Sequence, residues 1–337
     1  MSQYLSLNKN ISINKNTSVI SLPILLYRCK PLMPKNHFKR LRVVMKYLLL
    51  YMKNGANEKT IGVNGEIALR VGYNNYKVIN MKDNIIYTVY TEENESIIFE
   101  SLEYRTESLM YEKILEIDQI NKIIKGQFYN GHHPNLTNIN NKYCKQKLGD
   151  LFVNLLTKSK VKEINSICYV EKQLNDSLDV LNRNTEKISN EQYQYVKTFL
   201  LSNYGEFIRN SPEENMQLTL SHGDIKQDNL LESNGEVVLI DWEFCGFRSP
   251  MYDFIKFKRR FSSYGDIFFL DIKKIIINYL ISSKNRSLIK YFQNDSKKYM
   301  NIFYLEDINL KLKQFETRRF ARDFSRIINH IKGIKNE

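Results

Sequence analysis

The sequence has few cysteines and no apolar run as long as the roughly 18 to 20 residues that cross a bilayer. The cysteines Cys29, Cys144, Cys168 and Cys245 are widely spaced, so they fit neither a CxxC metal site nor a dense disulfide framework. The short apolar segment at residues 20–27 lacks a small-residue cleavage site, which argues against a signal peptide. Together these absences favour a protein of the reducing cytoplasm.

Acidic residues are nearly absent from the first 60 residues, which contain eleven Lys and Arg against the single acid Glu58. Most of the net charge of +13 therefore lies in this part of the chain. Within it, residues 37–53 show the spacing of an amphipathic cationic helix. The apolar stripe of this helix contains Phe38, Leu41, Met45, Leu48 and Met52, and the basic stripe contains Lys39, Arg42, Lys46 and Lys53.

This helix has two interpretations. In the first, the apolar stripe packs against the rest of the protein and the lysines are solvated. In the second, the basic face contacts anionic lipid at the inner face of the membrane, or attracts an anionic acceptor such as a lipid-linked or phosphorylated glycan. A late basic cluster, Arg318, Arg319, Arg322 and Arg326, would extend the same surface. No nucleic-acid-binding module is recognisable, so no nucleic-acid partner is expected.

An apolar fraction of 42% over 337 residues excludes a disordered chain and is enough for two cores. Residues 1–60 are predicted to be a basic N-terminal extension, with residues 1–20 as a poorly ordered or extended leader. Residues 61–125 are predicted to form a small β-rich lobe. Residues 126–337 are predicted to form a larger, mostly helical lobe.

The small lobe is expected to contain three strands, at residues 66–71, 77–81 and 85–90, followed by a Glu-rich helix within residues 96–117. Residues 126–136 contain Gly131 and Pro134 and are typical of a linker. His132 and His133 lie there without the carboxylate or thiol partners of a metal site, which favours a solvated loop. Two or three helices are expected between residues 140 and 209.

Residues 218–243 contain the pattern that indicates chemistry. The polar loop from His222 to Asn229 precedes an Asn-Gly turn and a buried-looking strand that ends at Asp241. A hairpin of this kind returns Asp241 towards the loop. Phosphoryl transfer needs a carboxylate that takes the proton of the acceptor hydroxyl, and Asp224 suits that role. It also needs hard oxygen ligands for magnesium, and Asn229 with Asp241 suits that role.

The spacing His-x-Asp-x-x-x-x-Asn, followed by a strand and Asp, resembles the catalytic loop of protein kinases. The variant His222-Gly223-Asp224 resembles the aminoglycoside phosphotransferase and choline kinase family, whose members phosphorylate small molecules. Only eleven residues separate Asp241 from Asp253, which leaves no room for a long activation segment. In this family the residue at Asp253 braces the catalytic loop. His222 is interpreted as another bracing residue.

The expected small lobe departs from this family pattern. The strand at residues 85–90 has no lysine to hold the nucleotide phosphates, although the candidate glutamates Glu100, Glu103 and Glu107 follow it. Arg70, Lys77 and Lys82 are the candidate substitutes on neighbouring strands. The alternatives are a different strand register, a different mode of nucleotide binding, or an impaired enzyme. Weaker nucleotide contacts are assigned to Gly72, Asn74 and Lys226, while a plain turn and a solvated lysine remain open.

The resemblance implies an α+β, bilobal protein-kinase-like fold and a small-molecule kinase. In such a fold, residues 61–125 would cover the nucleotide, and residues 126–337 would carry catalysis and bind the acceptor. Mg²⁺ is the expected cofactor, and ATP or GTP is the expected phosphoryl donor. The acceptor is a small molecule or glycan, and the basic surface favours a sugar or glycan-lipid. The alternatives are choline, ethanolamine or an aminoglycoside. A non-catalytic kinase-like scaffold is the alternative of a different class.

Overall fold

A computed structural model describes most of the chain, as residues 2–8, 10–18, 20–32, 36–53, 58–71, 75–90, 102, 113–134, 142–158, 161–210, 215–233, 235–283, 285–293, 297–315 and 320–335. The chain divides into two compact units. The first unit comprises residues 1–138 and 226–243, and the second comprises residues 139–225 and 244–337. The segment with the predicted chemistry is therefore shared between the two units.

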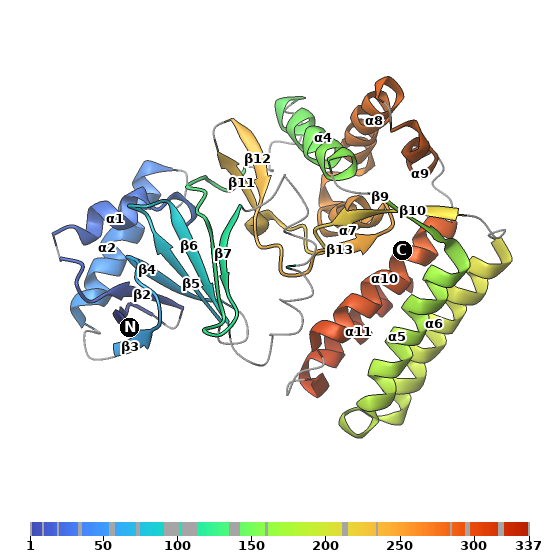
Figure 1. The fold of residues 1–337 in the computed structure, drawn as a ribbon, viewed down its shortest axis with the longest axis horizontal. Coiled ribbons are helices and arrows are strands. Elements are labelled where there is room, and N and C mark those ends of the chain that lie inside the picture. Colours follow the sequence, from blue (N-terminus) through green and yellow to red (C-terminus); the bar gives the residue numbers. More distant parts are fainter. Residues whose placement is uncertain are drawn as a thin grey trace. The chain divides into compact units, whose positions relative to one another are not determined.

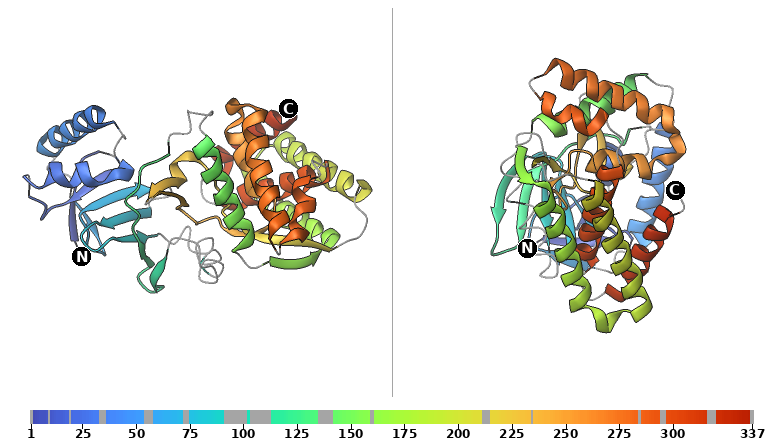
Figure 2. Two further views of the ribbon diagram at one scale, coloured as in Figure 1. Left: turned by 90° about the horizontal axis from the view of Figure 1, so that it is seen from above. Right: turned by 90° about the vertical axis from the view of Figure 1, so that its right-hand side faces the viewer.

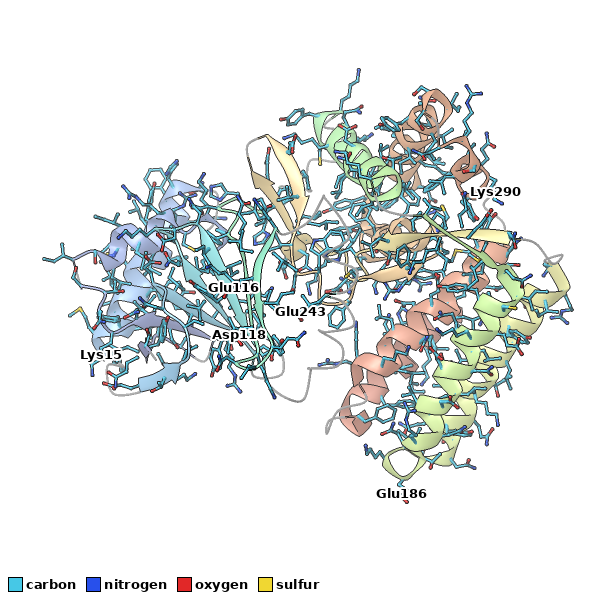
Figure 3. All side chains as sticks on the ribbon, in the orientation of Figure 1. Lys15, Glu116, Asp118, Glu186, Glu243 and Lys290 are labelled. Atoms are coloured by element: carbon cyan, nitrogen blue, oxygen red, sulfur yellow. The ribbon has the colours of Figure 1, made fainter. Side chains whose placement is uncertain are left out.

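The first unit is built on an antiparallel sheet with the strand order β3-β1-β2-β4-β5-β6-β8-β7 (Figure 1). Its strands are β1 (Ser2–Ser6), β2 (Ile11–Asn14), β3 (Glu58–Ile61), β4 (Ile67–Val71), β5 (Asn75–Asn80), β6 (Ile85–Val89), β7 (Ile114–Asp118) and β8 (Ile123–Gln127). Figure 3 labels Glu116 and Asp118 on β7, the last strand in this order. The three strands expected in the small lobe correspond to β4, β5 and β6.

Two helices, α1 (Leu22–Arg28) and α2 (His37–Lys53), lie on one side of this sheet (Figure 2). The core between them contains Leu26 and Val44 from the helices and Ile13 and Ile67 from the strands. The burial of these apolar side chains supplies the main driving force for this packing. A smaller cluster that includes Tyr4 and Val78 lies elsewhere in the sheet.

The N-terminal part differs from the prediction. Residues 1–60 do not form an extension outside the small lobe, because β1, β2 and β3 are strands of its sheet. Tyr4 of β1 is fully buried, and its hydroxyl donates to the carbonyl oxygens of Val63 and Gly65, at 3.1 and 3.2 Å. Of the helix expected within residues 96–117, residues 114–117 form part of β7, and most of the remainder lies outside the described residues.

The apolar stripe of α2 also differs from the first of its two interpretations. Arg40 and Val44 are buried, whereas the predicted core residues Phe38 and Met45 are 79% and 57% exposed. Leu41 and Met52 are exposed too, and only Leu48 of the stripe is partly buried. The helix therefore packs through a neighbouring face, and the prediction that this stripe packs against the protein is wrong.

The predicted linker histidines are held by contacts within the first unit. His132 forms a backbone bridge with Glu232, and its Nε2 lies 3.1 Å from Nη2 of Arg40. The Nδ1 atom of His133 lies 3.0 Å from the carbonyl oxygen of Leu230. The prediction of a solvated loop is therefore wrong. Glu232, the bridge partner of His132, lies in the hairpin of β11 (Leu230–Ser233) and β12 (Glu236–Leu239), which belongs to the first unit.

The second unit is mostly helical, as predicted for the C-terminal part. Its helices are α4 (Lys142–Thr157), α5 (Ser166–Arg183), α6 (Asn190–Asn210), α7 (Tyr252–Arg260), α8 (Asp266–Ser282), α9 (Ile289–Gln293), α10 (Lys297–Phe315) and α11 (Phe320–Lys335). The helices expected between residues 140 and 209 correspond to α4, α5 and α6. Figure 3 shows Glu186 at the turn between α5 and α6, and α10 packs against both helices.

A small antiparallel sheet in the second unit leads into the predicted loop. Its strand order is β13 (Gly246–Arg248), β10 (Asn215–Ser221) and β9 (Val161–Asn165). The central strand β10 is buried over most of its length and ends at Ser221, immediately before His222. Among the described residues, no helix combines the length and the apolar character that crossing a bilayer requires.

Candidate active site

The loop that follows β10 is held by hydrogen bonds to the first turn of α7. Asp253 in that turn accepts the backbone N–H groups of His222 and Gly223, at 2.6 and 3.1 Å. His222 is fully buried, and its Nδ1 accepts the backbone N–H of Asp224 at 3.2 Å. Charge-assisted hydrogen bonds of this kind fix the backbone of a loop. These are the contacts that the bracing roles proposed for Asp253 and His222 require.

Gly223 occupies a position that a side chain does not fit. Its φ angle is +81°, in the left-handed region that favours glycine, and an added Cβ would lie 2.2 Å from the carbonyl oxygen of Phe244. Nζ of the buried Lys256 donates to the carbonyl oxygen of Gly223 at 2.6 Å. Any side chain at this position would therefore require the backbone to move.

Asp224 is 9% exposed, and its carboxylate has a cationic partner in the same unit. Nη2 of Arg260, in the last turn of α7, lies 2.8 Å from Oδ1 of Asp224. The Nη1 atom of the same arginine donates to the carbonyl oxygen of Ile225 at 3.2 Å. Arg260 therefore holds both the predicted base and the loop around it. Sequence reasoning missed Arg260, because only the helical phase of α7 distinguishes it from Lys258 and Arg259.

In the first unit, the predicted hairpin forms. Leu230 pairs with Leu239 and Ser233 with Glu236, and Gly235 in the turn has a φ angle of +84°. Beyond the ladder, the backbone N–H of Ile240 donates to the carbonyl oxygen of Asn229 at 2.9 Å. This bond brings the chain on either side of the hairpin together, next to Asp241.

Asp241 follows the hairpin in a backbone conformation that is rare for residues other than glycine. Its φ angle is +70°, and such outliers cluster at functional sites. Nζ of Lys77 lies 2.7 Å from Oδ1 of Asp241, with side-chain exposures of 12% and 27%. Lys77 lies within β5, between Leu69 of β4 and Thr88 of β6. The sheet therefore supplies a strand lysine to the aspartate that the motif assigns to metal.

Among the three candidate substitutes for the missing lysine, the contact with Asp241 distinguishes Lys77. Lys82 lies exposed in the turn after β5, and Arg70 pairs in the ladder with Tyr76. The sequence identified Lys77 only as one of three, because the strand register that directs its side chain depends on the neighbouring strands.

The donor set near the hairpin fits magnesium of the kinase type. Asp241 offers a carboxylate, and Asn229, which is 3% exposed, offers an amide oxygen. Magnesium is commonly held by one or two such protein oxygens, with substrate phosphates and water completing its octahedron. Among the described residues, no group of three or more His, Cys, Asp or Glu side chains is arranged as a metal cluster. A magnesium ion at this position would take its remaining ligands from substrate phosphates and water.

The remaining predicted site residues are less well defined. Lys226 is half-buried and immediately precedes the 3₁₀ turn Gln227–Asn229, so it stays a candidate phosphate contact. Gly72 and Asn74 lie outside the described residues, as do Glu100, Glu103 and Glu107. Of the late basic cluster, Arg326 is described and exposed, while the side chains of Arg318, Arg319 and Arg322 lie outside the description.

A buried charged cluster on α10 contacts α7, and through Lys256 it also contacts the loop. Asp307 of α10 contacts Lys256, Lys311, His330 and the hydroxyl of Tyr252. Burial opposes ionisation of Asp307, but the surrounding cations outweigh it and hold its pKa well below the ordinary value of 3.8. Burial lowers the pKa of Lys256 to about 8, although Asp307 opposes that shift.

The residue before Asp307 forms a second buried contact set. Glu306 accepts hydrogen bonds from the backbone and hydroxyl of Ser249, at 2.6 and 2.7 Å, and from the hydroxyl of Tyr169 at 2.6 Å. Burial raises the pKa of Glu306. Glu306 therefore holds Ser249, just before α7, and Asp307 holds Tyr252 and Lys256 within α7. No motif in the sequence identified these two acids.

These features can be compared with known proteins. Residues 170–274 match the model of the phosphotransferase enzyme family. The matched segment contains the braced loop, the hairpin and Asp253. The resemblance to the aminoglycoside phosphotransferase and choline kinase family is confirmed. The predicted activity, a kinase that acts on small molecules, is consistent with the matched family. A search of curated proteins finds no match.

Two solved structures have similar folds. Choline kinase LicA from Streptococcus pneumoniae is 15% identical, with 80% of this chain and 94% of that chain covered and a TM-score of 0.51. An ethanolamine kinase from Plasmodium vivax is 15% identical, with coverages of 92% and 93% and a TM-score of 0.50. At such identities the likeness shows the fold. The predicted fold class is therefore confirmed, with a β-rich N-terminal sheet and a mostly helical C-terminal part.

Proposed function

We propose that this protein transfers the γ-phosphate of ATP or GTP to a hydroxyl group of a small molecule. The observation that carries the proposal is the contact between Lys77 and Asp241. A kinase-like chain without a strand lysine would have favoured a non-catalytic scaffold. The contact between Lys77 of β5 and Asp241 supports a catalytic role over the scaffold hypothesis, which was motivated by the missing lysine.

In the proposed mechanism, Asp224 orients the acceptor hydroxyl and takes its proton as the oxygen attacks the γ-phosphorus. The bond between the γ-phosphorus and the bridging oxygen breaks, and ADP or GDP leaves with that oxygen. Arg260 keeps the Asp224 carboxylate oriented, and the Asp253 contacts keep the loop in place. Asn229 and Asp241 would hold Mg²⁺, which when bound neutralises the charge that develops on the phosphates. Lys77 exchanges its contact with Asp241 for one with a phosphate oxygen. Catalysis then rests on positioning and electrostatics, as a loose transition state requires.

The acceptor is proposed as an amino alcohol first. The similar solved structures are named as a choline kinase and an ethanolamine kinase, which motivates this choice. Aminoglycosides come second, because the motif resembles a family that includes aminoglycoside phosphotransferases. The support for a sugar or glycan-lipid acceptor is the basic surface of α2, so this acceptor comes third.

The experiment incubates the protein with Mg²⁺ and labelled ATP or GTP, together with each acceptor in turn. The wild type is compared with Asp224→Asn and with the matched control Asp228→Asn, an exposed carboxylate in the same loop. Transfer that is lost in Asp224→Asn and retained in Asp228→Asn supports the proposal. Equal transfer by all three proteins would show that the base is wrong. Nucleotide binding without transfer to any acceptor would favour the scaffold.

A further inference from the structure

The exposed face of α2 is the most pronounced feature that the proposed function does not use. Five large apolar side chains of this helix are between 53% and 79% exposed: Phe38, Leu41, Met45, Leu49 and Met52. At 3.6 residues per turn, they fall within an arc of about 80°. They form one continuous apolar stripe along the helix, hereafter the α2 stripe.

The fold does not need the α2 stripe. The opposite side of the helix already packs on the sheet through Val44, with Val43, Tyr47 and Tyr51 packed against the same core. Scattered single apolar residues on a surface are normal, but five aligned on one helix mark an interaction site. The charged residues beside the stripe indicate what it binds.

A basic edge runs beside the α2 stripe. Lys39, Arg42, Lys46 and Lys53 are all exposed, and at helical spacing they fall within about 60° immediately next to the stripe. The helix contains no acidic residue. This combination of an apolar stripe and a cationic edge is the pattern of helices that lie in the plane of a membrane interface.

We propose that α2 docks onto an anionic lipid surface, with the α2 stripe at the acyl boundary and the basic edge among the lipid headgroups. Charge complementarity decides among the occupants. A second copy with the same face would bring two basic edges together, and like charges at an interface oppose association. A nucleic acid would engage the basic edge but would leave the apolar stripe in water. An anionic membrane satisfies both parts at once.

The experiment uses the full chain and sedimentation with vesicles of phosphatidylcholine, with or without phosphatidylglycerol. We expect binding to the anionic vesicles that weakens at high salt, because the headgroup attraction is screened. The apolar variant is Leu41→Ser with Met45→Ser and Leu49→Ser, and it should weaken binding by at least about 100-fold. The matched control is Ile267→Ser with Leu270→Ser on α8, whose residues are similarly exposed and which should bind like the wild type.

A second variant tests the basic edge independently. Arg42→Gln with Lys46→Gln should weaken binding to anionic vesicles about 30-fold, at about 1 kcal/mol for each cation near the surface. The exposed pair Lys158→Gln with Lys172→Gln has the same charge change elsewhere and should have little effect. Equal binding to neutral and anionic vesicles would overturn the proposal, as would wild-type binding by the apolar variant. So would a dimer in light scattering that the apolar variant abolishes, because it would assign the stripe to a second copy.

Discussion

Replacement of Lys77 by Met tests whether this residue acts as the strand lysine. Met keeps a flexible apolar side chain of similar length in the half-buried sheet and removes the ammonium group that lies 2.7 Å from Asp241. A hydrogen bond to a charged group contributes about 1.5–3 kcal/mol. If Lys77 transfers that contact to a nucleotide phosphate, kcat/KM should fall by about 10- to 150-fold, at about 1.4 kcal/mol per factor of ten.

The same substitution should change stability much less. Asp241 is 27% exposed and stays partly solvated when its partner is removed. The loss is therefore closer to the roughly 1 kcal/mol of an exposed ion pair than to the roughly 3–5 kcal/mol of a buried one. Trp242 is the single tryptophan of the chain and is buried next to Asp241 in the sequence, so its fluorescence is expected to change on unfolding and on nucleotide binding.

Lys82→Met is the matched control, because Lys82 lies exposed in the turn after β5. Stopped-time transfer assays with labelled ATP or GTP would compare both variants with the wild type, and Trp242 fluorescence would give nucleotide affinity. Unchanged kcat/KM in Lys77→Met, or an equal loss in Lys82→Met, would refute the assignment. A large loss of stability would show instead that Lys77 is structural.

The other predictions concern the loop and its supports. Gly223→Ala should lower the free energy of unfolding by more than about 3 kcal/mol, since its Cβ meets backbone at 2.2 Å, whereas Gly235→Ala, with open space around it, should cost about 1–2 kcal/mol in urea titrations. Arg260→Gln should reduce kcat about 10- to 100-fold with little change in melting temperature, and Lys258→Gln should not. Asp307→Asn should cost about 3–5 kcal/mol at neutral pH. Because the folded-state pKa of Asp307 is depressed, that difference should persist above pH 3.8 and shrink as the pH falls further; a difference that is constant down to pH 2 would contradict this assignment.

Local patterns predicted much of the fold and of the site. The strands β4, β5 and β6 and the hairpin after Asn229 follow from apolar residues bounded by turn residues, and these signals depend on near neighbours in the sequence. The contact between Asp253 and the loop was predicted from the resemblance to the family, in which this residue braces the catalytic loop. In each case the residues that decide the structure lie close together or belong to one motif.

The parts that the sequence did not reveal depend on contacts between distant residues. Strands β1 and β2 are short and rich in polar residues, so their pairing with β3 and β4 leaves no local signal. For α2, periodicity detects an apolar stripe but does not say which of two apolar faces packs, and Val44 rather than Met45 meets the core. Arg260 reaches Asp224 across 36 residues of chain through the phase of α7.

The most direct test of the proposed kinase activity is transfer of labelled phosphate from ATP or GTP to an amino alcohol, with wild type and Asp224→Asn compared side by side. We expect Mg²⁺-dependent transfer by the wild type, and a fall in kcat of at least about 100-fold in the variant, with nucleotide affinity unchanged by Trp242 fluorescence. Equal turnover by the two proteins would contradict the account.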